Sequence, residues 1–144
     1  MRVVVADDHS LFRDGIISLL EAAEYDVVAQ VGDGRDAVEA VRRYRPDLAL
    51  LDISMPDMNG IEALRQIKDE FPATSVVMLT VSDSDEDLFA AIEIGANGYL
   101  LKDLDAQDFL SILDGIQKGE AAVTRKTAAR IMHRVQDLSN QNQK

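Results

Sequence analysis

Short apolar runs alternate along the chain with longer segments in which apolar residues recur every three or four positions. The short runs are typical of strands buried on both faces, and the longer recurrence is typical of amphipathic helices. In the first helical segment, Leu11, Phe12 and Ile16 are predicted to face the core. The predicted strands are residues 3–6, 25–31, 48–51, 76–79 and 99–101.

The strict alternation of strand and helix patterns predicts an α/β fold with a parallel sheet and helices on both faces. Right-handed crossovers favour the flavodoxin-like, doubly wound arrangement of a five-stranded parallel sheet in the order 2-1-3-4-5. A further helix, amphipathic and basic, is expected after Glu120. We therefore expect one main domain at residues 1–119 and, at residues 120–144, a helical connector that ends in a polar linker at residues 139–144.

Composition narrows the classes of function. The formal net charge is −11 at pH 7, and basic residues outnumber acidic ones only from Glu120 onward. The main domain therefore repels nucleic acid phosphates and attracts divalent cations. The chain has no Cys, which excludes disulfides and thiolate metal sites, and it has no long apolar run, which indicates a cytoplasmic protein without membrane contact.

Acidic residues directly follow two of the predicted strands. Asp7 and Asp8 come after the first strand, and Asp52 comes after the third. In the expected strand order these strands are neighbours, and ligands bind at the carboxyl ends of parallel strands. We therefore expect the three carboxylates to form one acidic site, with Thr80 and Lys102 arriving from the ends of the fourth and fifth strands.

Adjacent carboxylates repel one another, so at least one pKa rises unless a cation is bound. Mg²⁺ prefers oxygen ligands and commonly uses one or two carboxylates together with waters and phosphate oxygens. We expect a site for Mg²⁺ or Mn²⁺, with direct ligation by Asp8 and Asp52, a water-bridged contact to Asp7 and the backbone carbonyl of Ser54. No glycine-rich phosphate loop occurs, so no organic cofactor is expected.

A carboxylate can also act as a nucleophile toward phosphorus and form an aspartyl phosphate. Asp52 is the candidate for this role. Phosphoryl transfer requires in-line positioning and neutralisation of the phosphoryl oxygens. We expect the Lys102 ammonium, the Thr80 hydroxyl and the cation to supply this neutralisation.

Several motifs in a fixed order resemble the receiver domain of two-component response regulators, over about residues 2–119. Each motif alone is modest, but the ordered set is specific. The motifs are Asp7-Asp8, residues 50–60 around Asp52, Thr80, and residues 98–103 with Tyr99 and Lys102.

Two details are similar to the NarL/FixJ subfamily. Asp103 follows Lys102 where many receivers have Pro, and His9 follows the acidic pair. Proteins of that subfamily carry a carboxyl-terminal helix-turn-helix output domain. The sequence ends before such a domain could fit, so we expect a receiver domain without its output domain.

The resemblance implies a role for each site residue. Asp52 would be the phosphoacceptor, Asp7 and Asp8 the magnesium acids, Lys102 and Thr80 the phosphoryl ligands, and Thr80 with Tyr99 the conformational switch. A sensor histidine kinase would donate the phosphoryl group, and activation would favour a homodimer. The protein would be a signalling switch in transcription regulation rather than an enzyme, able to autodephosphorylate, and would contact DNA only through an output domain.

Two other functions fit parts of the pattern. A phosphatase with an aspartate nucleophile, similar to haloacid-dehalogenase-like enzymes, would need a general acid two residues after Asp52, where the chain has Ser54. A docking module of receiver fold that is never phosphorylated is favoured if Val81, larger than the usual residue after Thr80, blocks access to the site.

Overall fold

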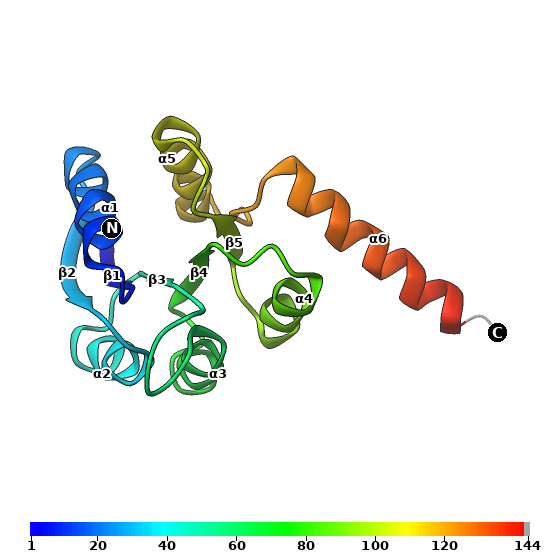
Figure 1. The fold of residues 1–144 in the computed structure, drawn as a ribbon, viewed down its shortest axis with the longest axis horizontal. Coiled ribbons are helices and arrows are strands. Elements are labelled where there is room, and N and C mark those ends of the chain that lie inside the picture. Colours follow the sequence, from blue (N-terminus) through cyan, green and yellow to red (C-terminus); the bar gives the residue numbers. More distant parts are fainter. Residues whose placement is uncertain (143–144) are drawn as a thin grey trace.

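The computed structural model describes residues 1–142 and contains a five-stranded sheet (Figure 1). Neighbouring strands all pair in parallel, in the order β2-β1-β3-β4-β5. The predicted flavodoxin-like α/β topology is therefore confirmed. The strands are β1 (Arg2–Ala6), β2 (Asp26–Val31), β3 (Leu48–Leu51), β4 (Ser75–Thr80) and β5 (Gly98–Leu101).

Helices cover both faces of the sheet. Figure 1 shows α1 and α5 on one face and α2, α3 and α4 on the other. Side-chain oxygens cap the N-termini of four of these helices. The capping residues Asp33, Asn59, Ser84 and Asp105 each accept a hydrogen bond from the backbone N–H three residues later. The helices are α1 (Ser10–Ala22), α2 (Gly34–Tyr44), α3 (Gly60–Glu70), α4 (Asp85–Ile94), α5 (Ala106–Asp114), the 3₁₀ turn η1 (Gly115–Lys118) and α6 (Arg125–Asn142).

The sheet separates two apolar cores. Successive residues of a strand point to opposite faces, so Leu50 packs with the α1 and α5 side while Leu51 packs with the α2, α3 and α4 side. Ile16 is buried as predicted, but Leu11 is 78% exposed, and its predicted core position is wrong. Phe12 packs against the core on the α1 and α5 side, whereas Leu11, in the first turn of α1, points away from it.

Strand register places the predicted site residues side by side. Ala6 of β1 pairs with Leu51 of β3, so the next residues, Asp7 and Asp52, leave the sheet at the same level. Thr80 of β4 pairs with Leu101 of β5, which places Lys102 next to the end of β4. The ends of β1, β3, β4 and β5 all lie at the carboxyl edge of the sheet.

The segment after α5 returns to the sheet before the last helix begins. Ala122 is fully buried and forms an isolated parallel bridge with Gly98 beside β5. The last helix, α6, starts at Arg125 and includes residues 139–142, which were expected to form the polar linker. No Gly or Pro interrupts these residues, so the helical hydrogen bonds can continue. Residues 143 and 144 of the expected linker lie outside the described part.

Among residues 1–142, no helix combines the length and the apolar character that crossing a membrane requires.

Candidate functional site

The acidic pair after β1 is held by backbone contacts. Asp7 is buried, and its Oδ1 accepts a hydrogen bond of 2.8 Å from the His9 N–H. The Arg13 guanidinium donates to the carbonyl oxygens of Asp7 and Val31, at 2.9 and 3.1 Å. Asp8 is exposed. One carboxylate of the pair therefore faces the interior of the site, and the other faces solvent.

Lys102 joins the two buried carboxylates. Its Nζ lies 2.7 Å from Asp7 Oδ2 and 3.3 Å from Asp52 Oδ2. The ammonium also lies 4.5 Å from the centre of the Phe12 ring, a distance that allows a cation–π interaction. Because all three ionisable side chains are at most 10% exposed, the charge on the ammonium is compensated mainly by the two carboxylates, and theirs mainly by the ammonium.

Asp52 has the most unusual environment in the site. Its backbone N–H donates to the Ala6 carbonyl at 3.0 Å, which continues the β1–β3 ladder to the carboxylate itself. Its Oδ1 is buried and has no hydrogen-bond partner among the described residues. Burial raises the pKa of Asp52; the Lys102 ammonium opposes this shift, and the nearby Asp7 charge adds to it. One oxygen of Asp52 is therefore left free to bind a cation or an incoming group.

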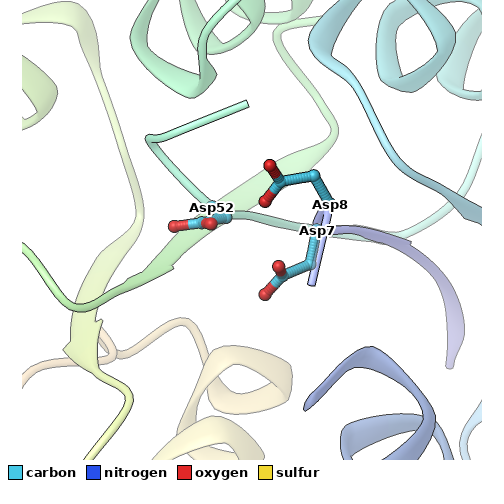
Figure 2. Close-up of side chains that lie close together, drawn as sticks. All are labelled: Asp7, Asp8 and Asp52. Atoms are coloured by element: carbon cyan, nitrogen blue, oxygen red, sulfur yellow. The ribbon is translucent and has the colours of Figure 1, made fainter. Parts of the chain in front are cut away.

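The three acids fit a divalent cation. Asp7, Asp8 and Asp52 each offer a carboxylate oxygen, and these oxygens lie within 4.8 Å of one another (Figure 2). A cation would give the unpartnered Asp52 oxygen a ligand and reduce the repulsion between Asp52 and Asp7. Figure 2 shows Asp7 and Asp8 coming from one chain segment and Asp52 from another, so a bound ion would link the ends of β1 and β3.

The raised pKa gives a test that needs no ligand. A carboxyl whose pKa is higher in the folded than in the unfolded chain stabilises the fold below both values, and this stabilisation is lost as pH rises through the folded pKa. Wild-type stability should therefore fall between the ordinary aspartate pKa and the raised value, relative to Asp52→Asn. Urea unfolding with EDTA at a series of pH values measures this difference. Equal pH dependence of the two proteins would contradict the raised pKa.

The loop from Asp52 to α3 passes very close to its own start. Gly60 N–H donates to the Ile53 carbonyl at 2.8 Å, and a Cβ at Gly60 would lie 2.0 Å from the Asp52 carbonyl oxygen. Only glycine fits this approach without displacing the backbone. Ser54, whose carbonyl was predicted as a metal ligand, is exposed in this loop. Its ligand role stays a prediction.

Thr80 and Tyr99 meet at one residue, Ser82. The fully buried Thr80 accepts a hydrogen bond at its Oγ1 from the Ser82 N–H, at 3.1 Å. The Tyr99 side chain is 1% exposed, and its hydroxyl donates to the Ser82 carbonyl at 3.0 Å. Burial raises the pKa of Tyr99, so its hydroxyl keeps its proton further into the alkaline range than that of an exposed tyrosine. Val81 is 73% exposed, so its side chain is directed mainly toward solvent.

The predicted residues thus divide into two connected groups. Asp7, Asp8, Asp52 and Lys102 form one cluster, while Thr80 and Tyr99 each form a hydrogen bond with Ser82 in the loop after β4. Three contacts were not predicted from the sequence: the Phe12 ring at Lys102, the Arg13 hydrogen bonds beside Asp7, and Ser82 as the shared partner. An arginine and an aromatic residue in a helix carry no sequence signal for such tertiary contacts.

Comparison with known proteins gives a consistent result. The response regulator receiver domain family matches residues 3–114. The transcriptional regulatory protein DegU of Brevibacillus brevis is 35% identical over 144 residues, which cover 99% of this chain and 61% of the relative. The oxygen regulatory protein NreC of Staphylococcus aureus (strain JH9) is 36% identical, with 99% and 66% covered. The chain therefore spans less than two thirds of the length of these curated relatives.

The fold has solved counterparts as well. The signal receiver domain of NarL from Mycobacterium tuberculosis superposes with a TM-score of 0.79 at 34% sequence identity. The superposition covers 83% of this chain and 97% of that domain.

Proposed function

The chain belongs to the response regulator receiver domain family, and we propose that it is a two-component switch in which Asp52 accepts a phosphoryl group from a sensor histidine kinase. The observation that carries this proposal is the buried Asp52 carboxylate, whose Oδ1 has no hydrogen-bond partner among the described residues and is left for the cation, while its Oδ2 lies 3.3 Å from the Lys102 ammonium. A carboxylate oxygen beside a cationic side chain can attack phosphorus while the charge on the phosphoryl oxygens is neutralised.

The reaction proposed for Asp52 needs little covalent help. One carboxylate oxygen attacks phosphorus of a phosphohistidine, a new O–P bond forms, and the P–N bond breaks with the imidazole as leaving group. The Lys102 ammonium, already between Asp7 and Asp52, is positioned to neutralise a phosphoryl oxygen. The buried Thr80 hydroxyl is the second group we assign to the phosphoryl.

The acidic cluster is assigned to Mg²⁺ or Mn²⁺. Asp7, Asp8, Asp52 and the Ser54 carbonyl would hold the ion, which supplies neutralisation of phosphoryl oxygens when bound. Asp8 is the exposed member of the set and gives the ion a path from solvent. Asp7 keeps the Lys102 ammonium directed toward Asp52.

The consequence of phosphorylation is assigned to the loop after β4. A phosphoryl group can shift a conformational equilibrium only through contacts that differ between the two states. Thr80 is the residue that would make the new contact, and Ser82 connects it to Tyr99. Phosphorylation would therefore change the surface formed by α4, β5 and α5.

The output of the switch is proposed from the relatives. One of them is named a transcriptional regulatory protein, and both extend well beyond the aligned part. We assign residues 1–119 to the receiver and residues 120–144 to the connector. The proposed partners are a sensor histidine kinase, a second copy of the chain on activation, and DNA through an output domain.

Acetyl phosphate tests the proposal without a cognate kinase. With Mg²⁺, intact-mass measurement should show one added phosphoryl group on the wild type and none on Asp52→Asn. Asp57→Asn changes an exposed acid of the same loop and should be labelled like the wild type. EDTA should prevent labelling, because the clustered carboxylates then lack their cation. Equal labelling of wild type and Asp52→Asn would refute the assignment.

A further inference from the structure

Within the described residues, the last helix is attached to the body of the protein through its first half. Thr127 is buried, and Ile131 packs against the core on the α4 side of the sheet. Residues 132–141 are all exposed, and in Figure 1 α6 extends away from the sheet beyond α4. The contacts in the first turns of α6 therefore determine the direction in which the rest of the helix points.

Arg130 makes the polar part of this attachment, and its partners are Asp83 in the loop between β4 and α4 and Asp85, the first residue of α4. Its guanidinium donates to Asp83 Oδ1 at 2.8 Å, to the Asp83 carbonyl at 3.0 Å and to Asp85 Oδ1 at 2.9 Å. Arg130 is 22% exposed, whereas Asp83 and Asp85 are more than 60% exposed. Several directed bonds from one planar guanidinium fix geometry more strictly than a single ion pair.

The loop to which Arg130 donates hydrogen bonds is also the loop that contacts Thr80 and Tyr99. Tyr99 donates to the Ser82 carbonyl, and Arg130 donates to the next carbonyl along the chain, that of Asp83. Ser82 N–H also donates to Thr80 Oγ1. One short segment therefore carries contacts from both switch residues and from α6, and it cannot move at Ser82 without affecting the Arg130 contacts at Asp83.

We propose that Arg130 is a positioning residue of the switch, which couples the docking of α6 to the loop conformation in which Tyr99 is buried. The inference deepens the proposed function and rests on it for the roles of Thr80 and Tyr99. Coupling between two sites is reciprocal. Loss of the Arg130 contacts loosens the loop and Tyr99, and loss of the Tyr99 hydroxyl bond loosens α6. A phosphoryl group that forms a hydrogen bond with Thr80 would change the docking of α6 through the same contacts at Ser82 and Asp83.

Hydrogen exchange of the full chain, followed by mass spectrometry, tests the coupling. In Arg130→Gln, amides of residues 82–87 and 127–134 should exchange about fivefold faster than in the wild type. Arg130→Lys keeps the charge without the planar fork and should restore only part of the protection. Arg134→Gln is the matched control, because Arg134 lies over the Phe89 ring, 5.4 Å from its centre, and within residues 1–142 it makes no ion pair or hydrogen bond with Asp83 or Asp85.

The reciprocal arm separates coupling from simple attachment. Tyr99→Phe keeps the ring and removes only the bond to Ser82, so faster exchange in residues 127–134 would show that the effect reaches α6. Unchanged exchange in α6 would overturn the inference, as would equal effects of Arg130→Gln and Arg134→Gln on residues 82–87.

A phosphorylation arm distinguishes failure of this inference from failure of the proposed function. Acetyl phosphate with Mg²⁺ should change α6 exchange in the wild type but not in Arg130→Gln. If both proteins are phosphorylated and respond equally, the coupling is wrong and the phosphoacceptor assignment stands. If neither is labelled, the proposed function fails, and the Tyr99→Phe result alone decides whether Arg130 couples α6 to the loop.

Discussion

Lys102→Met should lower the free energy of unfolding by about 3 kcal/mol at pH 7 without divalent cations. The substitution keeps a long apolar side chain beside Phe12, but it leaves Asp7 and Asp52 buried without the Lys102 ammonium that pairs with both of them. It also removes the charge that opposes the raised pKa of Asp52. Urea unfolding in EDTA measures the loss.

Two further measurements identify the cause of the stability loss in Lys102→Met. Mg²⁺ should recover much of the lost stability, because an ion at the carboxylates replaces the missing positive charge, and lower pH should do the same by protonating Asp52. Lys118→Met is the matched control, since Lys118 is exposed and makes no salt bridge among the described residues. A Lys102→Met protein as stable as the wild type would mean that the ion pairs contribute nothing to the fold.

Gly60→Ala should cost about 3 kcal/mol or prevent folding. The added Cβ would lie 2.0 Å from the Asp52 carbonyl oxygen and 2.8 Å from the Ile53 Cα, and both are backbone atoms. Relief requires the loop between β3 and α3 to move, which shifts the phosphoacceptor. Thermal unfolding gives the stability, and acetyl phosphate labelling should be lost together with it.

Gly15→Ala is the control for this substitution. Gly15 lies inside α1, and nothing would lie within 4 Å of an added Cβ there. Alanine in a helix interior should therefore raise stability, by about 0.5–1 kcal/mol. If Gly60→Ala were tolerated like Gly15→Ala, the close approach of the loop to Asp52 would be wrong.

The sheet and the acidic cluster could be predicted because their signals are local. The short apolar runs defined the strands, and strict alternation with helices left one common strand order. That order makes the strands before Asp7 and Asp52 neighbours, so their proximity followed from topology. The register of β1 and β3 agrees with it.

Other contacts depended on packing that the sequence does not encode locally. The apolar pattern of α1 did not distinguish Leu11 from Phe12, because the helix rotation that selects one of them is set by contact with the sheet. The return of Ala122 to β5 is a backbone bridge without a motif. The Arg130 contacts join residues more than 40 positions apart. A basic helix predicts a charged surface, not a particular partner.

Borohydride reduction shows directly whether Asp52 is the residue that accepts the phosphoryl group. The reagent reduces an acyl phosphate to an alcohol, so an aspartyl phosphate becomes homoserine, whereas an unmodified carboxylate does not react. After treatment with acetyl phosphate and Mg²⁺, peptide mapping of the reduced wild type should find homoserine at position 52. Homoserine at Asp7, Asp8 or Asp57 instead, or a stable phosphate on a hydroxyl side chain with Asp52 unchanged, would contradict this role of Asp52.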